Sequence, residues 1–470
     1  MHYWLALGVM GMAVSAASAG VAAEIAKDRM LVVDGKRTFV LGIYENPADD
    51  AIMRQIADAG FNLIQTPAKA EALDRAASFG LHAWINTGAS IDFSVDRKAR
   101  EKALEGLVAD YAGHPALLAW EVPDEALWNC WYGAMQWRHD QEPAQQRARI
   151  DALQDTALKE RLRGMQADSK RLFSRGAIAA SERMADEIWR MLGVEPPNPE
   201  LNISNAQKRS EMMCKGMIEG YHRLKGLDAK HPVWMNHAPR NSIEQLAAFN
   251  RGADIVGCDI YPVPAYRTGH SDLMERSIAA VGAYTDRMQD AAPGKPVWMV
   301  LQGFAWSDLE KNPTPKSIEE MRVPTFAESR FMAYDAIVHG ARGILYWGTA
   351  YTKRDGTLWA DLLKLVRELA DLQPVLSAPD GRMRLRVERA PTWGSGDRTV
   401  RVLPKAAGRE VWLIVVNESL EPMTYTVSGL SGLDGTRYHD PQDDREAVVK
   451  NGSLSLDISP QSVQVLRPEA

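Results

Sequence analysis

The feature that most constrains the fold of this chain is a regular alternation of short apolar runs with amphipathic stretches between residues 39 and 372. Continuous apolar runs are typical of parallel strands buried on both faces. The eight strand-like runs are Phe39–Tyr44, Phe61–Thr66, Leu81–Asn86, Leu117–Val122, Pro232–Asn236, Ile255–Ile260, Pro296–Gln302 and Gly343–Trp347. The stretches with helical spacing include Asp49–Ala59, Ala70–Phe79, Asp96–Tyr111, Ile243–Asn250, Leu273–Met288, Ala327–His339 and Leu358–Leu372. Eight such units predict an α/β fold, a (β/α)8 TIM barrel.

An open, doubly wound sheet is the alternative architecture, and it is disfavoured because no glycine-rich phosphate turn follows an early strand. Ahead of the barrel, Met30–Val33 and Thr38–Leu41 flank the dipeptide Asp34-Gly35. That dipeptide is typical of a two-residue turn, so these runs predict a hairpin.

Two segments fall outside the eightfold pattern. A mostly helical stretch at about 127–205 interrupts the fourth unit and ends in a proline-rich exit linker, Glu195–Pro199. After residue 378 the pattern changes to short alternating runs separated by Gly, Pro, Asn and Asp, which predict an all-β sandwich. We expect a barrel over residues 24–378 with a long insertion after strand four, and a C-terminal sandwich over 379–470.

The N-terminal segment and the net charge indicate the location of the protein and the class of its partners. Residues 4–17 are apolar and too short to span a bilayer comfortably, and small-residue sites at Ala17-Ser18-Ala19 and Val21-Ala22-Ala23 follow. Residues 1–23 therefore predict a signal peptide and a secreted or periplasmic protein with no membrane contact after cleavage; an uncleaved anchor is the alternative. A net charge of −6 without a basic patch makes nucleic acid an unfavourable partner.

The three cysteines have no metal-ligand spacing. Cys130 and Cys214 flank the insertion, so the sequence allows either a disulfide between them or two free thiols. Cys258 lies inside a strand-like run and is predicted to be a core residue.

In a TIM barrel the site forms where the strands end at the C-terminal face. The residues that fall there are Tyr44, Glu45, Asn46, Asn86, Asp124, Glu125, Asn236, His237, Arg240, Asp259, Tyr261, Gln302, Trp306 and Trp347. This set has no phosphate loop and no clustered histidines, so neither a cofactor nor a metal is predicted. A metal-assisted site of His237, His270 and Asp259 is the minor alternative.

Carboxylates, amides and aromatic rings in this set suit a sugar, whose C–H faces stack on tryptophan and whose hydroxyls need paired donors and acceptors. Trp306 and Trp347 are predicted ligand contacts, whereas Trp84, Trp234 and Trp298 lie inside strands and are predicted core residues.

The acidic residues of the fourth strand-helix unit can also be explained by structural roles. Glu121 lies within the strand and is predicted to pair with a cation, Arg54 or Arg240, since an unpaired buried charge is costly. Asp124 fits either a helix cap or a substrate contact.

Three motifs resemble a known family. Residues 121–125, Glu-Val-Pro-Asp-Glu, resemble the strand-four signature Glu-x-x-Asn-Glu-Pro of clan A glycoside hydrolases. Asp259-Ile260-Tyr261-Pro262 resembles the clan's strand-six pattern, which ends in a Tyr that orients the nucleophile. Trp347 resembles the strand-eight Trp that floors the first sugar subsite. The resemblance covers about residues 39–372, and it implies Glu125 as general acid/base and Asp124 in the place of the Asn that holds a substrate hydroxyl.

Strand seven departs from that pattern, because Gln302 stands where the clan has its nucleophilic Glu. A retaining mechanism is therefore not carried over. Asp259 is the preferred second carboxylate, and a separation of about 6.5–9.5 Å from Glu125 would imply inversion. Glu310 or Glu328 from the strand-seven connection is a second possibility, and binding without cleavage is a third.

The sequence thus predicts a glycoside hydrolase that acts on an oligo- or polysaccharide. Its catalytic candidates are Glu125, Asp259 and Asp124. Its substrate-binding candidates are Asn86, Asn236, His237, Arg240, Tyr261, Gln302, Trp306 and Trp347. The rival hypothesis is a non-catalytic glycan-binding barrel.

Overall fold

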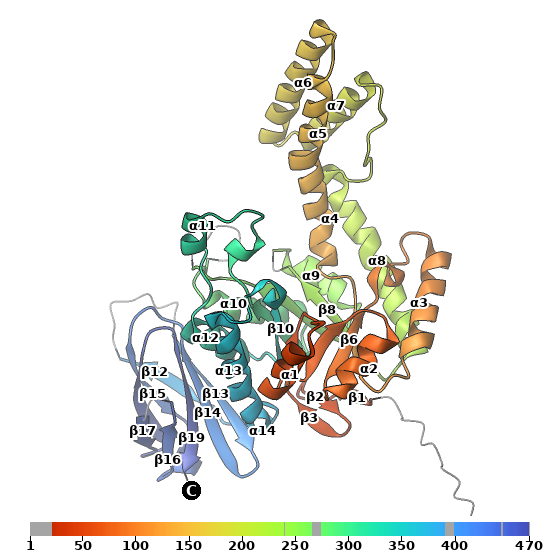
Figure 1. Cartoon of the computed structure of the whole chain (residues 1–470). Coiled ribbons are helices and arrows are strands. Elements are labelled where there is room, and N and C mark those ends of the chain that lie inside the picture. Colours follow the sequence, from red (N-terminus) through yellow and green to blue (C-terminus); the bar gives the residue numbers. More distant parts are fainter. Residues whose placement is uncertain (1–20, 239, 266–273, 391–398, 443–444, 470) are drawn as a thin grey trace, which may run out of the picture.

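The computed structural model describes residues 21–238, 240–265, 274–390, 399–442 and 445–469. Eight parallel strands close into a barrel, and each strand pairs with its neighbours in the chain (Figure 1). They are β4 (Val40–Ile43), β5 (Leu63–Thr66), β6 (His82–Asn86), β7 (Leu117–Glu121), β8 (Val233–His237), β9 (Ile255–Ile260), β10 (Val297–Gln302) and β11 (Gly343–Trp347). The predicted TIM barrel is confirmed.

Helices cover the outside of the barrel. They are α1 (Asp50–Ala59), α2 (Ala70–Ser78), α3 (Arg97–Tyr111), α8 (Ala206–Leu227), α9 (Ile243–Asn250), α10 (Ala280–Ala291), α12 (Phe326–Val338) and α13 (Thr357–Asp371). The helix predicted from residue 273 begins only at Ala280. Ser277 explains the delay, because its N–H donates to Glu275 Oε1 at 2.7 Å and its hydroxyl accepts from Ala279 N at 3.2 Å. Such local bonds compete with a helical backbone.

The barrel interior is apolar below its mouth. Trp84, Trp234 and Trp298 are fully buried there, as predicted for core residues. A small sheet of β1 (Ala23–Ile25), β2 (Leu31–Val33) and β3 (Lys36–Thr38) packs Leu31 and Val33 against the same interior cluster. This sheet closes the end of the barrel opposite the mouth (Figure 1).

The predicted hairpin turn joins β2 to β3. Asp34 and Gly35 have φ angles of 47° and 78°, the positive pair that a type I′ turn requires. Ala22 also exchanges backbone and side-chain bonds with Asp34, at 2.9 and 3.1 Å. A chain cut after residue 23 would lose these contacts, whereas a cut after residue 19 would keep them; residues 1–20 lie outside the described chain. Among the described residues, none of the helices combines the length and apolarity that crossing a bilayer requires.

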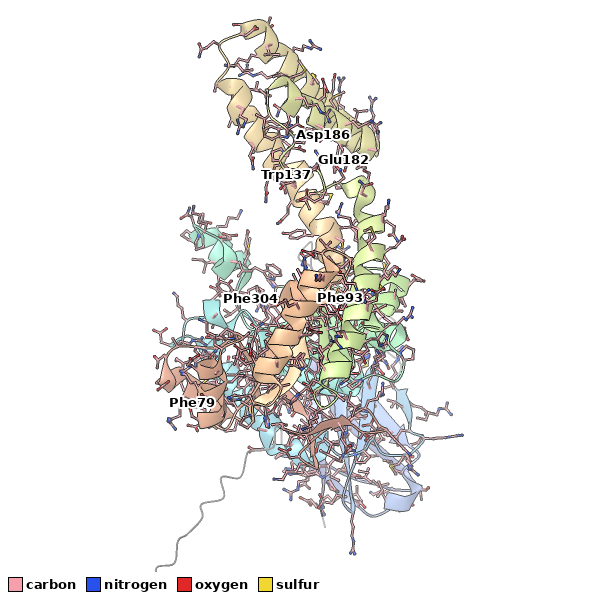
Figure 2. All side chains as sticks on the ribbon, turned by 90° about the vertical axis from the view of Figure 1, so that its right-hand side faces the viewer. Phe79, Phe93, Trp137, Glu182, Asp186 and Phe304 are labelled. Atoms are coloured by element: carbon pink, nitrogen blue, oxygen red, sulfur yellow. The ribbon has the colours of Figure 1, made fainter. Side chains whose placement is uncertain are left out.

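The insertion after β7 is a helical stalk that rises from the mouth side of the barrel (Figure 1). A nearly continuous helix comprises α4 (Ala126–Met135), a π-helical turn (Gln136–Gln141) and α5 (Glu142–Asp151). The chain continues through α6 (Thr156–Ser174) and α7 (Ile178–Met191), and then returns to the barrel along α8. Figure 2 shows Trp137, Glu182 and Asp186 in this stalk, well separated from Phe79 on the barrel.

Cys130 and Cys214 lie on the two helices that join the stalk to the barrel, α4 and α8, and both are free thiols. Cys130 Sγ is 3.8 Å from the sulfur of Met213. Cys258 is free and fully buried, as predicted for a core residue.

The C-terminal residues form antiparallel sheets beside the barrel. One sheet contains β13 (Val400–Ala407), β14 (Glu410–Asn417), β19 (Ser462–Glu469), β16 (Arg437–Asp440) and β17 (Arg445–Val448). The other contains β12 (Arg386–Arg389), β15 (Met423–Ser428) and β18 (Ser453–Ile458). Apolar residues of β14 and β19, including Ile414 and Val465, join the barrel's own hydrophobic cluster, so this β domain is packed firmly against α12.

Candidate functional site

Each barrel strand carries a polar or aromatic side chain at its last inward-facing position. Alternation points every second residue of a strand into the barrel, so these side chains meet at one level above the apolar interior. We call them the mouth ring: Tyr44, Gln65, Asn86, Glu121, Asn236, Asp259, Gln302 and Trp347. The ring separates the dry barrel core from the open end of the barrel.

Glu121 is the most deeply buried acid of the mouth ring, with no exposed surface. Its Oε1 accepts a hydrogen bond from Tyr44 Oη at 2.8 Å. Its Oε2 accepts from Asn86 Nδ2 at 2.8 Å, Trp84 Nε1 at 3.1 Å and Gln65 Nε2 at 3.4 Å. Burial raises the pKa of Glu121 to about 7, and the nearby Asp124 charge adds to that rise while the donors oppose it.

The predicted ion pair of Glu121 is wrong. Arg54 lies over the ring of Phe79, 5.2 Å from its centroid, and Arg240 lies over the ring of Trp128 at 5.7 Å. Neutral donors from β5, β6 and the end of β4 stabilise the carboxylate in place of a cation. A buried carboxyl group that is bonded only to neutral donors can gain or lose a proton near neutral pH. Such a shifted pKa is typical of a functional site.

Asp124 and Glu125 lie at the rim where β7 passes into α4. Glu125 occupies the N-cap position of α4 with φ 48° and ψ 32°, a left-handed conformation that is uncommon for a residue other than glycine. Its N–H donates to the Asn236 carbonyl at 3.3 Å. Asp124 is exposed and is not the helix cap; its carboxylate instead accepts from Asn236 Nδ2 at 2.9 Å.

The carboxyl groups of Glu125 and Asp259 lie close enough to interact directly, and either can donate a hydrogen bond to the other only while it is protonated. Burial is the main cause that raises the pKa of Glu125, to about 7; the Asp124 charge adds to it and Arg240 opposes it. Burial and the Glu125 charge raise the pKa of Asp259 well above its ordinary value. We expect the pair to titrate as a unit.

The distance between these two acids decides which mechanism the pair could support. An inverting pair needs room for a water, about 6.5–9.5 Å between carboxyl groups, and a retaining pair needs about 5–5.5 Å. A direct contact between two carboxyls leaves no room for a water between them, so it is closer to the retaining than to the inverting spacing. We therefore describe Glu125 and Asp259 as a coupled acid pair.

Aromatic rings form a wall beside this acid pair. Tyr261 is hydrogen-bonded to Asp259, and its ring stacks on Trp347 with centroids 5.5 Å apart at 22°. Trp306 contacts Tyr261 edge-on at 6.2 Å and donates its Nε1–H to the Tyr261 carbonyl at 3.3 Å. The predicted residues Tyr261, Trp306 and Trp347 therefore lie together, and all three remain partly exposed.

Gln302 does not line an open surface. It is fully buried, and its Nε2 donates to the carbonyls of Val263 at 2.8 Å and Phe304 at 3.0 Å. Its Oε1 accepts from Val263 N at 2.9 Å. The amide therefore links the loops that follow β9 and β10, and a carboxylate could not make both donations. The structure therefore gives Gln302 a role in linking two loops, and not the open position that the predicted contact with substrate would need.

His237 corrects a second expectation. Its side chain lies on the outer face of β8 and is buried, with Nε2 2.8 Å from Asn250 Oδ1 of α9. Burial lowers the pKa of His237 to about 4, so the ring is neutral. Its inward neighbour Asn236 reaches Asp259 instead, at 3.5 Å. His237 is thus turned away from the mouth, and His270, the other predicted metal contact, lies outside the described residues.

Among the described residues, one group of metal-type ligands lies elsewhere, between α12 and the β domain. It comprises Asp335, His339 and Glu418, with ligand atoms within 4.8 Å of one another. Arg401 Nε donates at 2.7 Å to Glu418 Oε1, the same oxygen that lies 2.7 Å from His339 Nε2. The guanidinium of Arg401 already supplies a positive charge to this group, so we describe it as an ion-pair network.

Sequence reasoning missed Gln65 and Phe304 and left Tyr44 without a role. Gln65 lies two residues after Leu63, an interior residue of β5, so the two-residue period alone indicates its inward direction. Phe304 is fully buried between Tyr261 and Trp347, at 5.1 Å from each. No local pattern marks it, because its partners come from other strands.

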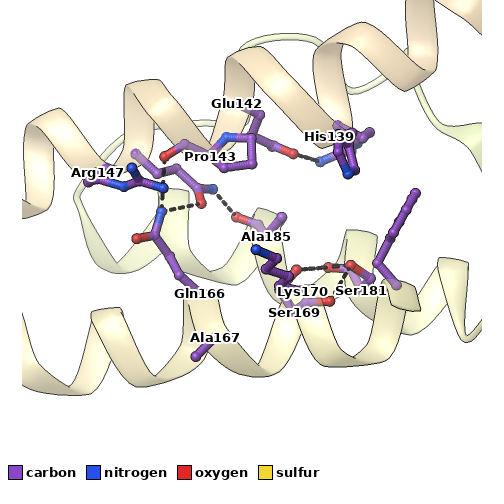
Figure 3. Close-up of a pocket in the computed structure, with 13 residues that line it drawn as sticks. His139, Glu142, Pro143, Arg147, Gln166, Ala167, Ser169, Lys170, Ser181 and Ala185 are labelled. Carbon is purple, nitrogen blue, oxygen red and sulfur yellow. Dashed lines mark hydrogen bonds and ion pairs between the residues drawn. The ribbon is translucent and has the colours of Figure 1, made fainter. Parts of the chain in front are cut away.

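A separate cavity of about 310 Å³ lies inside the stalk, between α5, α6 and α7 (Figure 3). Gln146, Gln166, Ser169 and Ser181 line it, and they are bonded to one another or to nearby carbonyls. Its one lining acid, Glu142, is bonded to Arg138 and Trp189. This cavity has no acid pair of the kind found at the barrel mouth.

Comparison with solved structures finds similar folds. A glycoside hydrolase family 5 protein from Bacteroides vulgatus ATCC 8482 matches with a TM-score of 0.53 and 13% identity, covering 95% of this chain and 93% of that chain. Gan42B, a GH42 β-galactosidase from G. stearothermophilus, matches with a TM-score of 0.51 and 10% identity, covering 92% of this chain and 98% of that chain. No family model and no curated protein matches this sequence. At these identities the likeness concerns the fold.

Proposed function

We propose that this protein is a glycoside hydrolase and that its site is the barrel mouth. The observation that carries the proposal is the meeting of two acids, Glu125 and Asp259, at the barrel mouth beside a wall of partly exposed aromatic rings, where burial raises the pKa of both. A proton donor next to a stacking surface is what cleavage of a glycosidic bond requires. The glycoside hydrolase folds of the structural neighbours support the same reading.

In this proposal the saccharide stacks on Trp347, and Glu125 donates its proton to the leaving glycosidic oxygen. The positive charge of Arg240 stabilises the Glu125 carboxylate that remains once the proton has left. A water attacks the anomeric carbon and passes its proton to a separate carboxylate. Asp124 is the candidate for that base, since it is exposed at the rim and oriented by Asn236.

The test is a panel of glycosides given to the wild-type protein and to single variants. Glu125→Gln and Asp259→Asn should each reduce turnover by at least about a hundredfold, because removal of general acid catalysis costs about 10²–10⁴. Both should retain binding. Glu319→Gln, an exposed acid of the short helix α11 (Pro315–Glu320), is the matched control and should change nothing. Unchanged turnover in Glu125→Gln would refute the assignment.

A second candidate function is glycan binding without cleavage. The buried amide of Gln302 favours it, because this residue stands where clan A hydrolases carry a nucleophile and it is wholly engaged in linking loops. Wild-type protein that binds saccharides but turns none over would support this second function against the first.

A further inference from the structure

The exposed face of α4 begins at the proposed proton donor. Glu125 caps this helix, and Trp128, Tyr132 and Met135 follow at spacings of three and four residues, which places them along one face. Tyr132 is 43% exposed and Met135 37% exposed. The opposite face, which includes Leu127 and Ala134, is buried.

Trp128 and Tyr132 form a flat aromatic surface on that face. Their rings are stacked with centroids 5.7 Å apart and planes at 19°. The buried side of α4 already packs on α8, where Cys130 meets Met213, so the stack is not needed to hold the stalk in place. Trp128 is half-buried and Tyr132 is exposed, so the pair presents the Tyr132 ring to a ligand with flat apolar faces, as sugar rings have.

Arg240 gives this surface a charge. Its guanidinium lies over the Trp128 ring, 5.7 Å from the centroid, and its field reaches Glu125. The Arg240 charge lies beside the proposed proton donor, where it lowers the pKa of Glu125 and faces any ligand bound there. Arginine pairs well with a carboxylate because its planar fork matches two oxygens.

We propose that the Trp128–Tyr132 face and Arg240 form a second binding region for a saccharide that carries carboxylates, a uronic-acid-containing chain. The sugars beyond the cleaved bond would run from Glu125 along α4, and a rise of 1.5 Å per residue puts Tyr132 about 10 Å from the acid. A uronate carboxylate would bind Arg240 while a neighbouring sugar ring packs on the exposed Tyr132, whose ring Trp128 supports from beneath. This inference rests on the proposed function for the position of the cleaved bond.

Calorimetric binding tests the proposal, with Glu125→Gln protein as the background so that no substrate is consumed. The probes are uronate tetrasaccharides and neutral tetrasaccharides of matched linkage. We expect at least about tenfold tighter binding of a uronate tetramer, and Arg240→Met should remove that preference. Arg467→Met is the matched control, because Arg467 lies over Trp412 of the β domain at 5.6 Å, and it should leave the preference intact.

Aromatic variants test the stacking surface. Trp128→Ala and Tyr132→Ala should each weaken tetramer binding by about tenfold and leave monosaccharide binding unchanged, whereas Tyr132→Phe, which keeps the ring, should bind like the parent. Equal affinity for uronate and neutral tetramers, or full affinity in Trp128→Ala, would overturn the proposal. Tetramer binding without wild-type turnover would refute the hydrolase assignment and leave this binding region standing.

Discussion

Tyr44 donates a hydrogen bond of 2.8 Å to Glu121 across the barrel interior, and Trp234 Nε1 in turn donates to the Tyr44 oxygen at 3.1 Å. These residues come from β7, β8 and the end of β4, so the chain of hydrogen bonds connects strands that are not neighbours. It holds a buried carboxylate in place without a cation.

Tyr44→Phe removes one of these donors and leaves Glu121 Oε1 buried without it. We expect the free energy of unfolding to fall by about 1–3 kcal/mol, the cost of an unsatisfied buried acceptor. Urea unfolding measures the change. Tyr132→Phe, at an exposed tyrosine, is the control and should be neutral. Equal stabilities for the two variants would show that the Tyr44 bond contributes nothing.

Most of the mouth ring was predictable, because strand positions and a two-residue period fix which side chains meet at the barrel mouth. Asn86, Asn236, Asp259 and Trp347 follow directly from the strand ends. His237 shows the limit of that argument, since a shift of one residue along β8 turns a side chain from the mouth to the helices.

Partner identity was not predictable in the same way. Glu121 was expected to need a cation, but its donors Tyr44, Gln65, Trp84 and Asn86 come from three other strand segments whose meeting depends on the closed barrel. The contact of Glu125 with Asp259 likewise joins residues far apart in the sequence. Spacing along one strand carries no information about such distances.

The Glu125 pKa of about 7 predicts an alkaline limb in the activity profile. Glu125 must be protonated to act as the acid, so kcat/KM should fall tenfold per pH unit well above pH 7. Asp124 must be ionised to act as the base and burial raises its pKa, so kcat/KM should also fall on the acid side. Arg240→Met removes a positive charge that lowers the Glu125 pKa, so the alkaline limb should move to higher pH. A pH–rate profile of the wild type and one of Arg240→Met locate the alkaline limb of each protein. A limb that moves to lower pH in Arg240→Met would contradict the assignment of Glu125 as the acid.

Gln302→Glu restores the residue that the clan A pattern has at this position, and we expect it to lower stability without adding turnover. A carboxylate cannot donate to the carbonyls of Val263 and Phe304, which would then be buried without their donor. The expected loss is about 2–4 kcal/mol in the free energy of unfolding. Gln245→Glu, at a half-exposed glutamine of α9, is the control for the added charge. A gain in turnover from Gln302→Glu would show that the position has access to substrate.

The junction between α12 and the β domain should make the protein less stable at alkaline pH. His339 lies among Asp286, Asp335 and Glu418, with Arg401 also bonded to Glu418. The neighbouring carboxylates raise the pKa of His339 to about 9 in spite of its burial. Burial raises the pKa of Asp335 to about 8.

Both shifts have the same sign with respect to pH. A folded-state pKa above the unfolded value means that the stabilisation by His339 is complete below about pH 6.5 and is lost as the pH rises through about 9. The raised pKa of Asp335 likewise disfavours the folded state as the pH rises from about 4 to about 8. The His339 contribution is on the order of 3 kcal/mol.

Urea unfolding above pH 9 isolates the His339 contribution, because Asp335, with a pKa of about 8, is largely ionised there. The free energy of unfolding of the wild type should fall over this range, and that of His339→Gln should change much less. His139→Gln, at an exposed histidine 2.7 Å from Asp140 in the stalk, should follow the wild type. Parallel losses in the wild type and His339→Gln would mean that another group controls the alkaline stability of this junction.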